Sequence, residues 1–524
     1  MSGQVDAGTL KAWLSDGAEI ALIDVRELGQ YGEGHPFFAV SLPYSRFELG
    51  LPALVPNPAT RMVLCDGGGG VAERAARRAE ALGYSGVGIL AGGAEGWRSA
   101  GYTLFAGVNV PSKTFGELVE HARQTPHVSA EALQAMQAAG EDLVILDGRT
   151  FAEFQKMSIP GGISCPNGEL ALRAGVLVPN PETRIVVNCA GRTRSIIGAQ
   201  TLIDCGVPNP VYALENGTQG WALAGLQLDH GASRRYGAPP ASAGLDALRP
   251  RARTLAQARG VRFVGASEVA GWLADPSRTT YLLDVRTPEE FAARPVAGFV
   301  HAPGGQLVQA TDQWIGTRGA RIVLLDEELV RAPIAAQWLR QQGHEACVLD
   351  GGIASATALA GLTGATASLP PDPPGIAPAG LQERLRHAHA HLVDLRASMS
   401  YRKEHIEGAV WSTRARVASA VADAADFVVL VADQAGIAAL AALDLAEAGV
   451  REVRLLDGGH EAACAAGLPM ASSPHAPCDA DCIDFLFFTH GRHEGDAAAA
   501  RQYLAWEIGL VDQLDPQERG AFRL

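Results

Sequence analysis

Residues 145–149 read Ile145-Leu146-Asp147-Gly148-Arg149, a short apolar run that ends in Asp-x-Arg. A run of this length and composition is typical of a buried strand, and the charged pair marks its end. One such pair is an ordinary strand-end ion pair, but the pattern recurs in the same register along the chain. The other three copies are Leu22–Arg26, Leu282–Arg286 and Leu392–Arg396. Four copies indicate an internal repeat.

The segments downstream of each copy also repeat. A second strand-like run is followed by an Ala-rich segment with helical periodicity that stops at a glycine, and then by another strand and a Gly turn. The second strand-like runs are Met62–Cys65, Ile185–Cys189, Ile322–Leu325 and Phe427–Val431. The glycines that end the helices are Gly83, Gly206, Gly343 and Gly449. This alternation predicts an α/β fold in which helices cover both faces of a small, mostly parallel sheet.

Length and composition set the limits for this repeat. The chain has 524 residues, which at about 100–200 residues per domain allows three to five domains. Its net charge of −14 argues against non-specific nucleic-acid binding, which needs clustered Lys and Arg. The sequence has no secretory signal pattern and no run of eighteen apolar residues, so we expect neither export nor a membrane span. The eight cysteines are sparse, which favours a reduced, cytoplasmic setting.

One strand-to-helix loop carries residues suited to catalysis. In the second copy a buried strand ends at Cys189 and we expect a helix to begin near Ser195. Loop N–H groups and a helix N-terminus favour negative charge at this place, and Arg192 and Arg194 add forked donors for an oxyanion. The same features favour the thiolate form of a cysteine, which is the nucleophile. Ser195 is equally well interpreted as a helix N-cap. The predicted substrate-binding residues are Ala190, Gly191, Arg192, Thr193, Arg194 and Ser195.

The other three copies lack this combination. At the position of Cys189 the first copy has Cys65, but its loop continues with Asp66 and four glycines and has no arginine. The third copy has Asp326-Glu327-Glu328, which lacks a thiol and would repel anions. The fourth has Val431-Ala432-Asp433, also without a thiol. We therefore expect one active site per chain.

The repeat resembles the rhodanese family. The resemblance rests on the Asp-x-Arg strand end, the Cys loop that opens a helix and the Gly-Gly-x-x-x-Trp turn before Trp97, and it covers about residues 8–475. It implies four tandem three-layer α/β domains with five-stranded sheets. It also implies a sulfurtransferase that moves sulfane sulfur from thiosulfate or a related donor to a thiophilic acceptor through a Cys189 persulfide. Such chemistry needs no metal and no organic cofactor.

The repeat and the linkers between its copies give expected domain boundaries. Pro-rich stretches mark two connectors, and residues 112–140 are expected to form two helices that lead into the second copy. The expected domains are 1–110, 111–231 (catalytic), 261–368 and 381–475, with linkers at 232–260 and 369–380 and a helical tail at 476–524.

Residues outside the loop are weaker candidates. In rhodanese domains the loop after the second strand lies near the active-site mouth, so Asn167 and Glu169 are expected to contact substrate and Arg173 to add charge there. A turn followed by an N-capped helix explains the same residues. Asp147 and Arg149 are expected to hold the domain together rather than to react.

Two further groups of residues invite chemistry but have plainer explanations. Cys165 could receive sulfur from Cys189 or form a disulfide with it, although a buried, inert thiol is favoured. The tail has a Cys-x3-Cys-x7-His-x2-His pattern that suggests zinc, but the gap between its pairs is shorter than in zinc fingers. These tail residues are Cys478, Cys482, His490 and His493. We expect a docked tail and no metal.

Three classes of function compete. A sulfurtransferase would use a small sulfur-donor anion, a thiol or cyanide-type acceptor and a possible protein acceptor, with no nucleic-acid or membrane partner. Thiosulfate, mercaptopyruvate, glutathione persulfide and a protein persulfide remain open as donors. A phosphatase would need Cys-x5-Arg, whereas Cys189 and Arg194 are spaced Cys-x4-Arg. A non-catalytic binding or scaffold protein is compatible with three degenerate copies.

Overall fold

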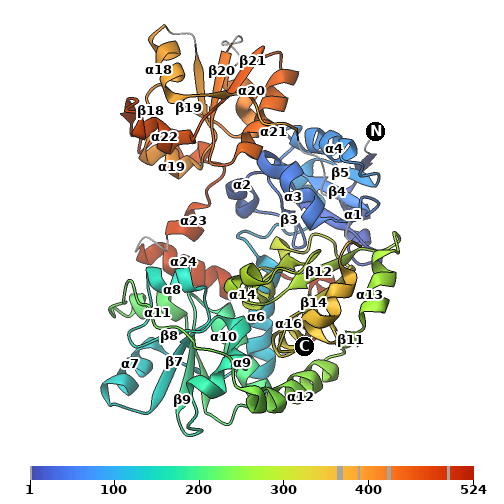
Figure 1. Cartoon of the computed structure of the whole chain (residues 1–524), viewed down its shortest axis with the longest axis vertical. Helices are drawn as coiled ribbons and strands as arrows, with labels where there is room; N and C mark the ends of the chain where they lie inside the picture. Colours follow the sequence, from blue (N-terminus) through green and yellow to red (C-terminus); the bar gives the residue numbers. More distant parts are fainter. Residues whose placement is uncertain (1–2, 363–369, 388–389, 422–426, 492–495) are drawn as a thin grey trace. The chain divides into compact units, whose positions relative to one another are not determined.

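The structure, a computed structural model, describes residues 3–362, 370–387, 390–421, 427–491 and 496–524. These residues form four α/β domains, each built on a five-stranded sheet with helices on both faces (Figure 1). In every sheet the first strand of the domain lies at one edge, followed in space by the fifth, fourth, second and third strands. All the strand pairs recorded within these four sheets are parallel. The predicted fold class is therefore confirmed.

The first two domains have matching element orders. The strands of the first are β1 (Gly3–Val5), β2 (Ala21–Asp24), β3 (Val40–Ser41), β4 (Met62–Cys65) and β5 (Val87–Leu90). Its helices are α1 (Ala7–Trp13), α2 (Leu28–Glu33), α3 (Phe47–Leu54), α4 (Val71–Ala81) and α5 (Gly93–Ser99). The strands of the second are β6 (His127–Val128), β7 (Leu143–Asp147), β8 (Ile163–Ser164), β9 (Arg184–Asn188) and β10 (Val211–Leu214). Its helices are α7 (Ala130–Ala138), α8 (Phe151–Lys156), α9 (Asn167–Leu177), α10 (Thr193–Asp204) and α11 (Gly217–Leu223).

The third and fourth domains repeat this order. The strands of the third are β11 (Arg262–Val264), β12 (Thr280–Asp284), β13 (Val300–His301), β14 (Arg321–Leu325) and β15 (Glu345–Leu349). Its helices are α13 (Ala266–Leu273), α14 (Pro288–Ala293), α15 (Gly304–Gln309), α16 (Arg331–Gln341) and α17 (Gly352–Ala356). The sheet strands of the fourth are β16 (Gly375–Ile376), β17 (His391–Asp394), β19 (Val410–Trp411), β20 (Phe427–Val431) and β21 (Glu452–Leu456). Its helices are α18 (Pro378–Arg386), α19 (Ser398–Lys403), α20 (Val417–Ala420), α21 (Ala435–Glu447) and α22 (Gly459–Ala465).

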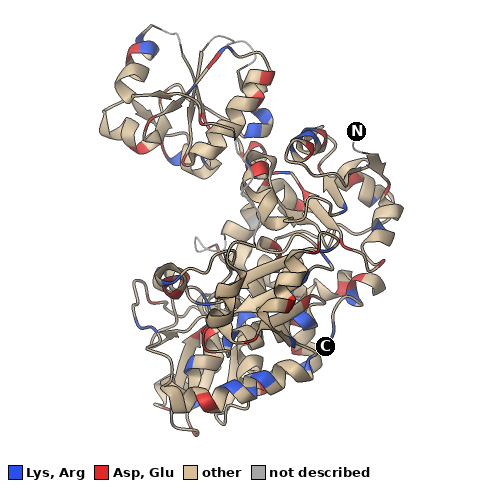
Figure 2. Cartoon of the chain, turned by 45° about the vertical axis from the view of Figure 1, so that its right-hand side comes forward, with Lys and Arg blue, Asp and Glu red and all other residues tan. Residues whose placement is uncertain are grey.

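Helices outside the repeat connect and follow the domains. The connectors are α6 (Val110–Arg123), before the second domain, and α12 (Ser242–Ala258), which lies within the expected linker 232–260. An antiparallel pair, β18 (His405–Ile406) and β22 (Met470–Ala471), closes the fourth domain. The tail contains α23 (Phe487–His490), α24 (Ala497–Ile508) and α25 (Pro516–Arg519). Within the part of the chain that the structure describes, no helix is both long and apolar enough to cross a membrane. Basic and acidic residues are both scattered over the helices (Figure 2).

The four domains group into two compact units that do not follow chain order. One unit comprises Met1–Lys11, Ala21–Gly107 and Thr366–Phe487, so it contains most of the first domain together with the fourth. The other comprises Ala12–Ile20, Val108–Ala365 and Phe488–Leu524, so it contains the second and third domains and the tail. The sequence repeat gives no signal for this pairing.

In the second unit the two domains share one apolar core. Phe115 of α6 and Ile197 of α10 lie in the same buried cluster as Trp338 of α16. The indole Nε1 of Trp338 donates to Thr201 Oγ1 at 2.8 Å, which satisfies a polar atom inside that interface. Each of these domains also buries an apolar cluster of its own, and α10 of the second domain packs in addition against the third.

The first unit has a buried ionic interface between its two domains. Arg414 of the fourth domain has no exposed side-chain surface and donates from Nη2 to Glu48 Oε1 (2.9 Å) and Asp444 Oδ1 (3.0 Å). Its guanidinium also lies over the ring of Tyr44 of the first domain, 4.2 Å from the ring centre. A buried arginine with two carboxylate partners fixes how these two domain surfaces meet.

Candidate active site

The sheet register places Cys189 at the carboxyl end of a central strand. Asn188, the last residue of β9, pairs with Asp147 of β7, and Cys189 follows it with 2% of its surface exposed. Helix α10 begins at Thr193 rather than near Ser195, and Arg192 is its N-cap residue. Ser195 lies inside the first turn, where its Oγ donates to the carbonyl of Arg192 at 2.8 Å. The N-cap interpretation of Ser195 is therefore wrong.

The Gly turn before α11 supports this loop from beneath. The N–H groups of Thr218 and Gln219 donate to the carbonyls of Cys189 (2.8 Å) and Ala190 (3.1 Å). Gly217 has a φ of +54°, and a Cβ there would lie 2.2 Å from the carbonyl oxygen of Cys189. Only glycine allows so close an approach, so this turn fixes the backbone of Cys189.

The Asp-x-Arg pair braces the end of the neighbouring strand. Arg149 donates to Asp147 from Nε (2.9 Å) and Nη2 (2.7 Å), and its Nη2 also reaches the carbonyl of Met157 (2.6 Å). Asn188 Nδ2 donates to the same aspartate at 2.8 Å, which ties β7 to the strand that carries the cysteine. The equivalent pairs Asp24–Arg26, Asp284–Arg286 and Asp394–Arg396 make the same contacts in the other domains.

The two loop arginines are bound to carboxylates of the protein. Arg192 donates from Nε and Nη2 to Glu117 of α6 (2.8 and 2.9 Å), so it points to the connector helix. Arg194 forms a two-bond ion pair with Glu153 of α8 (2.9 and 2.7 Å). Although burial by itself raises the pKa of Glu153, the Arg194 charge and hydrogen bonds hold it well below its usual range. The forked donors expected to face the substrate are thus engaged, although Arg194 remains close enough for its charge to interact with Cys189.

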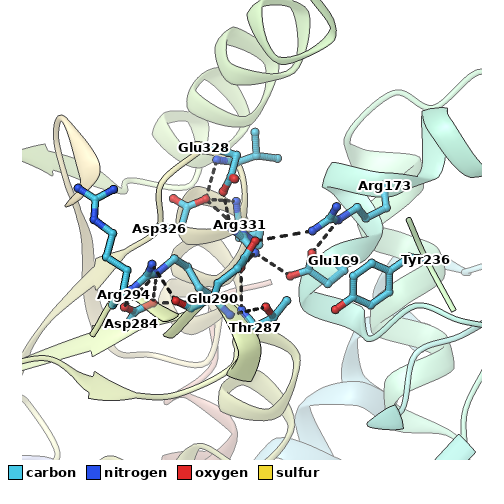
Figure 3. A network of polar contacts seen from close by, with 12 residues as sticks. Glu169, Arg173, Tyr236, Asp284, Thr287, Glu290, Arg294, Asp326, Glu328 and Arg331 are labelled. Carbon is cyan, nitrogen blue, oxygen red and sulfur yellow. Dashed lines mark hydrogen bonds and ion pairs between the residues drawn. The ribbon is translucent and has the colours of Figure 1, made fainter. Parts of the chain in front are cut away.

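The candidate substrate contacts after the second strand, Asn167, Glu169 and Arg173, lie in two different places. Asn167 Nδ2 donates to the carbonyl of Arg194 at 2.8 Å, so it supports the loop from below. Glu169 accepts from Arg173 Nε (2.9 Å) and from Arg331 Nη1 of the third domain (3.0 Å), as Figure 3 shows. The structure therefore brings Glu169 and Arg173 to the interface between domains and not to the pocket beside Cys189. Glu169 pairs with the buried Arg331 of the third domain, and Arg173 pairs with Glu169 and with Glu290 of the third domain.

A pocket of about 430 Å³ opens beside the loop. Ala190, the residue after Cys189, belongs to its lining, together with Met157 and Leu223 on the apolar side. Charged residues of both signs line the pocket: Arg149 and Lys156 are basic, and Glu153 and Asp496 are acidic. The site is therefore a mixed pocket rather than a basic cleft.

The C-terminal tail covers one side of this site. Asp496, Ala497 and Ala500 line the pocket, and α24 packs against α11 and α6 (Figure 1). Glu507, on the same face of α24, has no exposed surface. It accepts a hydrogen bond from Thr193 Oγ1 at 2.6 Å, at the start of α10. The sequence analysis missed this role, because a tail outside the repeat carries no signal of where it docks.

The register corrects the alignment of the first domain. Cys65 pairs with Asp24 as Asn188 pairs with Asp147, so Cys65 is the last strand residue and Asp66 holds the place of Cys189. Cys65 has no exposed surface, and burial raises the pKa of its thiol well above the usual value. An inaccessible thiol of this kind does not act as a nucleophile.

In the first and third domains, the loop equivalent to that of Cys189 binds the carboxylate of its own aspartate through backbone N–H groups. Asp66 accepts from the N–H groups of Gly68 (2.7 Å), Val71 (3.0 Å) and Ala72 (3.1 Å). In the third domain Asp326 accepts from Val330 (3.1 Å) and Arg331 (3.0 Å). The loop amides of the third domain therefore already bind the carboxylate of Asp326. In the fourth domain the place of Cys189 is held by Ala432, after the strand end at Val431.

The remaining cysteines give no support to a relay or a tail zinc site. Cys165 is fully buried, and burial raises the pKa of its thiol well above the usual value. The eight cysteines all lie within the described residues and form no disulfide bond with one another. Of the tail pattern, Cys482 is buried and the exposed Cys478 donates to Asp481 (3.1 Å), while His493 lies outside the described residues.

A parallel α/β domain with a cysteine between a central strand and the next helix defines a class of enzymes that use a cysteine loop. The chain belongs to the rhodanese family, since the Rhodanese-like domain model matches residues 6–100, 129–224, 266–358 and 377–466. It is similar over its whole length to the solved thiosulfate sulfurtransferase from Pseudomonas aeruginosa, with 44% identity and a TM-score of 0.91, covering 100% of this chain and 99% of that one. The chain is thus a rhodanese-type enzyme.

A second relative matches one stretch of the chain. The Bacillus subtilis (strain 168) protein named "Putative sulfur carrier protein YrkF" is 37% identical over 83 residues. The match covers 16% of this chain and 44% of the length of that protein.

Proposed function

We propose that this protein is a sulfurtransferase in which Cys189 carries sulfane sulfur as a persulfide. The observation that carries the proposal is the comparison of equivalent loops. Where the second domain has Cys189, the first and third domains hold an aspartate on loop N–H groups. A loop that accepts a carboxylate there is suited to a cysteine thiolate and to the persulfide anion that it would form.

The proposed reaction has two balanced steps. The thiolate of Cys189 attacks the outer sulfur of a donor, and the bond between the two donor sulfurs breaks with its electron pair leaving on the inner group. With thiosulfate, the products are the Cys189 persulfide anion and sulfite. An acceptor thiolate then attacks the outer sulfur of the persulfide and departs as a new persulfide, which regenerates the Cys189 thiolate. No metal, oxidant or reductant enters either step.

The pocket supports a donor with an organic body. Its volume of about 430 Å³ is within the usual range for small-molecule sites and exceeds what thiosulfate would fill. Its lining contains two basic residues, Arg149 and Lys156, and two acidic residues, Glu153 and Asp496. Such a lining suits a zwitterionic thiol persulfide, such as that of glutathione, better than a bare dianion.

The two alternatives are less well supported. A phosphatase needs an arginine free to clamp the phosphoryl group, and Arg194 is held by both oxygens of Glu153. A purely structural role for the second domain would leave the pocket beside Cys189 without a purpose, whereas the buried thiol Cys65 shows what an inert cysteine looks like in this fold.

Mass spectrometry of the full-length chain tests the proposal. After incubation with thiosulfate or glutathione persulfide and removal of excess donor, we expect a gain of one sulfur atom that maps to the peptide containing Cys189. Cys189→Ser should show no gain, and the matched control Cys65→Ser should load like the wild type. Sulfur on any other cysteine, or loading of the Cys189→Ser chain, would contradict the assignment.

A further inference from the structure

The fourth domain carries a cluster of metal-ligand side chains on its surface. Cys464 Sγ lies 3.6 Å from Glu404 Oε2 and 3.8 Å from His460 Nε2. His460 Nε2 lies 3.5 Å from the same glutamate oxygen. One sulfur, one nitrogen and one oxygen therefore stand at the corners of a nearly equilateral triangle.

These separations match the coordination of zinc. With Zn–S near 2.3 Å and Zn–N or Zn–O near 2.0–2.1 Å, tetrahedral geometry places neighbouring ligand atoms roughly 3.3–3.6 Å apart. A cation close to the centre of the triangle would lie at about those bond lengths from all three atoms. A thiolate, an imidazole and a carboxylate together select a borderline-soft divalent ion such as Zn²⁺ over Mg²⁺ or Ca²⁺.

The cluster stands where the second domain has its pocket. Arg396 Nη2 donates to the carbonyl of Glu404 (2.8 Å), as Arg149 Nη2 does to that of Met157 (2.6 Å), so Glu404 and Met157 are equivalent. The left-handed pair Gly458 and Gly459 corresponds to Asn216 and Gly217. His460 and Cys464 on α22 therefore replace Thr218 and Ala222 on α11, and Met157, Thr218 and Ala222 all line the pocket of the second domain.

The three side chains can be reached from solvent. Cys464 and Glu404 are exposed and His460 is half-buried, so an ion can reach them. Asp433, at the position of Ala190, adds a further carboxylate to the loop that follows the central strand.

We propose that Glu404, His460 and Cys464 form a zinc site in the fourth domain. Binding displaces the thiol proton of Cys464 to solvent and gives three protein ligands. The fourth position faces the surface and is left for water or an incoming thiolate, as in open zinc sites. The fourth domain, which has Ala432 at the place of Cys189, would thus carry a metal where the second domain has its pocket, contrary to the expectation of no metal.

Metal titration of the full-length chain tests this site. After treatment with a chelator, the chain should bind one Zn²⁺ per molecule, and Co²⁺ in its place should give the thiolate-to-cobalt absorption band. Cys464→Ser and His460→Ala should lose that band and the bound zinc. Glu404→Gln, which keeps an oxygen but not its charge, should weaken zinc binding by about tenfold. Cys478→Ser, which removes another exposed cysteine, is the matched control and should bind like the wild type.

Three outcomes would overturn the proposal. The first is no zinc bound by the chain at micromolar concentration. The second is a cobalt band that persists in Cys464→Ser, and the third is a band that disappears in Cys478→Ser. Circular dichroism of each variant identifies loss of fold, and His460→Gln provides a milder second variant at the same position.

Discussion

The loops around Cys189 and Asp326 share one backbone arrangement and differ in chemistry. Each follows a central strand and precedes a helix, and each has an arginine five residues after Cys189 or Asp326. Arg194 binds Glu153 of α8, and Arg331 binds the equivalent Glu290 of α14. In both domains that glutamate also completes a capping box.

This comparison shows that the arginine is part of the framework. Since the Arg–Glu pair occurs in a domain without a catalytic thiol, an arginine at this position does not by itself mark an active site. The difference lies in what the loop amides hold. In the third domain they bind Asp326, whereas in the second a cysteine stands beside a pocket that the tail completes.

The largest expected effect comes from giving the second domain the residue of the third. Cys189→Asp should lower sulfur transfer by roughly a thousandfold or more, since the carboxylate cannot form a persulfide. The fold should persist, because Asp66 and Asp326 occupy equivalent places. Cyanolysis rates and the urea midpoint measure the two effects, with Cys205→Ser as a control. Retained activity would refute the role of Cys189, and failure to fold would refute the equivalence of the loops.

The second prediction concerns the tail, which contacts the start of α10 through Glu507. Glu507→Ala removes the acceptor for Thr193 Oγ1, and a hydrogen bond to a charged group contributes about 1.5–3 kcal/mol. We expect sulfur loading to slow by roughly tenfold, since this hydrogen bond positions the start of α10. Glu507→Gln keeps an acceptor oxygen and should lose much less. Single-turnover loading followed by mass spectrometry is the measurement. Equal rates for Ala, Gln and wild type would show that the tail does not position the loop.

Substitution of the glutamate partners of Arg194 and Arg331 should have a smaller effect. Glu153→Gln removes a negative charge from the pocket and leaves Arg194 uncompensated, so KM for thiosulfate should fall roughly fivefold with kcat little changed. Glu290→Gln makes the matched change in the third domain and should leave both parameters as they are. If the two variants behave alike, the pocket beside Cys189 is not where the donor binds.

The smallest effect is a pH trend in the third domain. Burial raises the pKa of Asp326, with Arg331 and the loop amides opposing it only in part. The folded state therefore binds the proton more tightly than the unfolded state, and this group's contribution to stability falls as pH rises from its ordinary pKa through the raised one. Asp326→Asn removes the ionisable carboxyl group, so its stability does not fall with rising pH for this reason. The urea midpoint of the variant minus that of the wild type should rise between pH 3.5 and 7, and a flat or falling difference would contradict the burial argument.

Local patterns were enough to predict the strands, the helices and the four-domain fold. Alternation of apolar strands with glycine-ended helices depends on neighbours within a few residues, so it is visible in one sequence. The place of Cys189 between strand and helix follows from the same patterns. The alignment of Cys65 with Cys189 failed by one residue because only the pairing of Asp24 with Cys65 fixes the register.

The sequence by itself determined the repeat, the alternation of strands and helices within each domain and the cysteine suited to sulfur chemistry. Only the tertiary structure decided which domains pair, which carboxylates hold Arg192 and Arg194, and that α24 lines the pocket. Those contacts join residues far apart in the chain, such as Glu507 with Thr193 and Trp338 with Thr201. Their partners are selected by surface fit and by the need to satisfy buried charges, and neither leaves a periodic trace in the sequence.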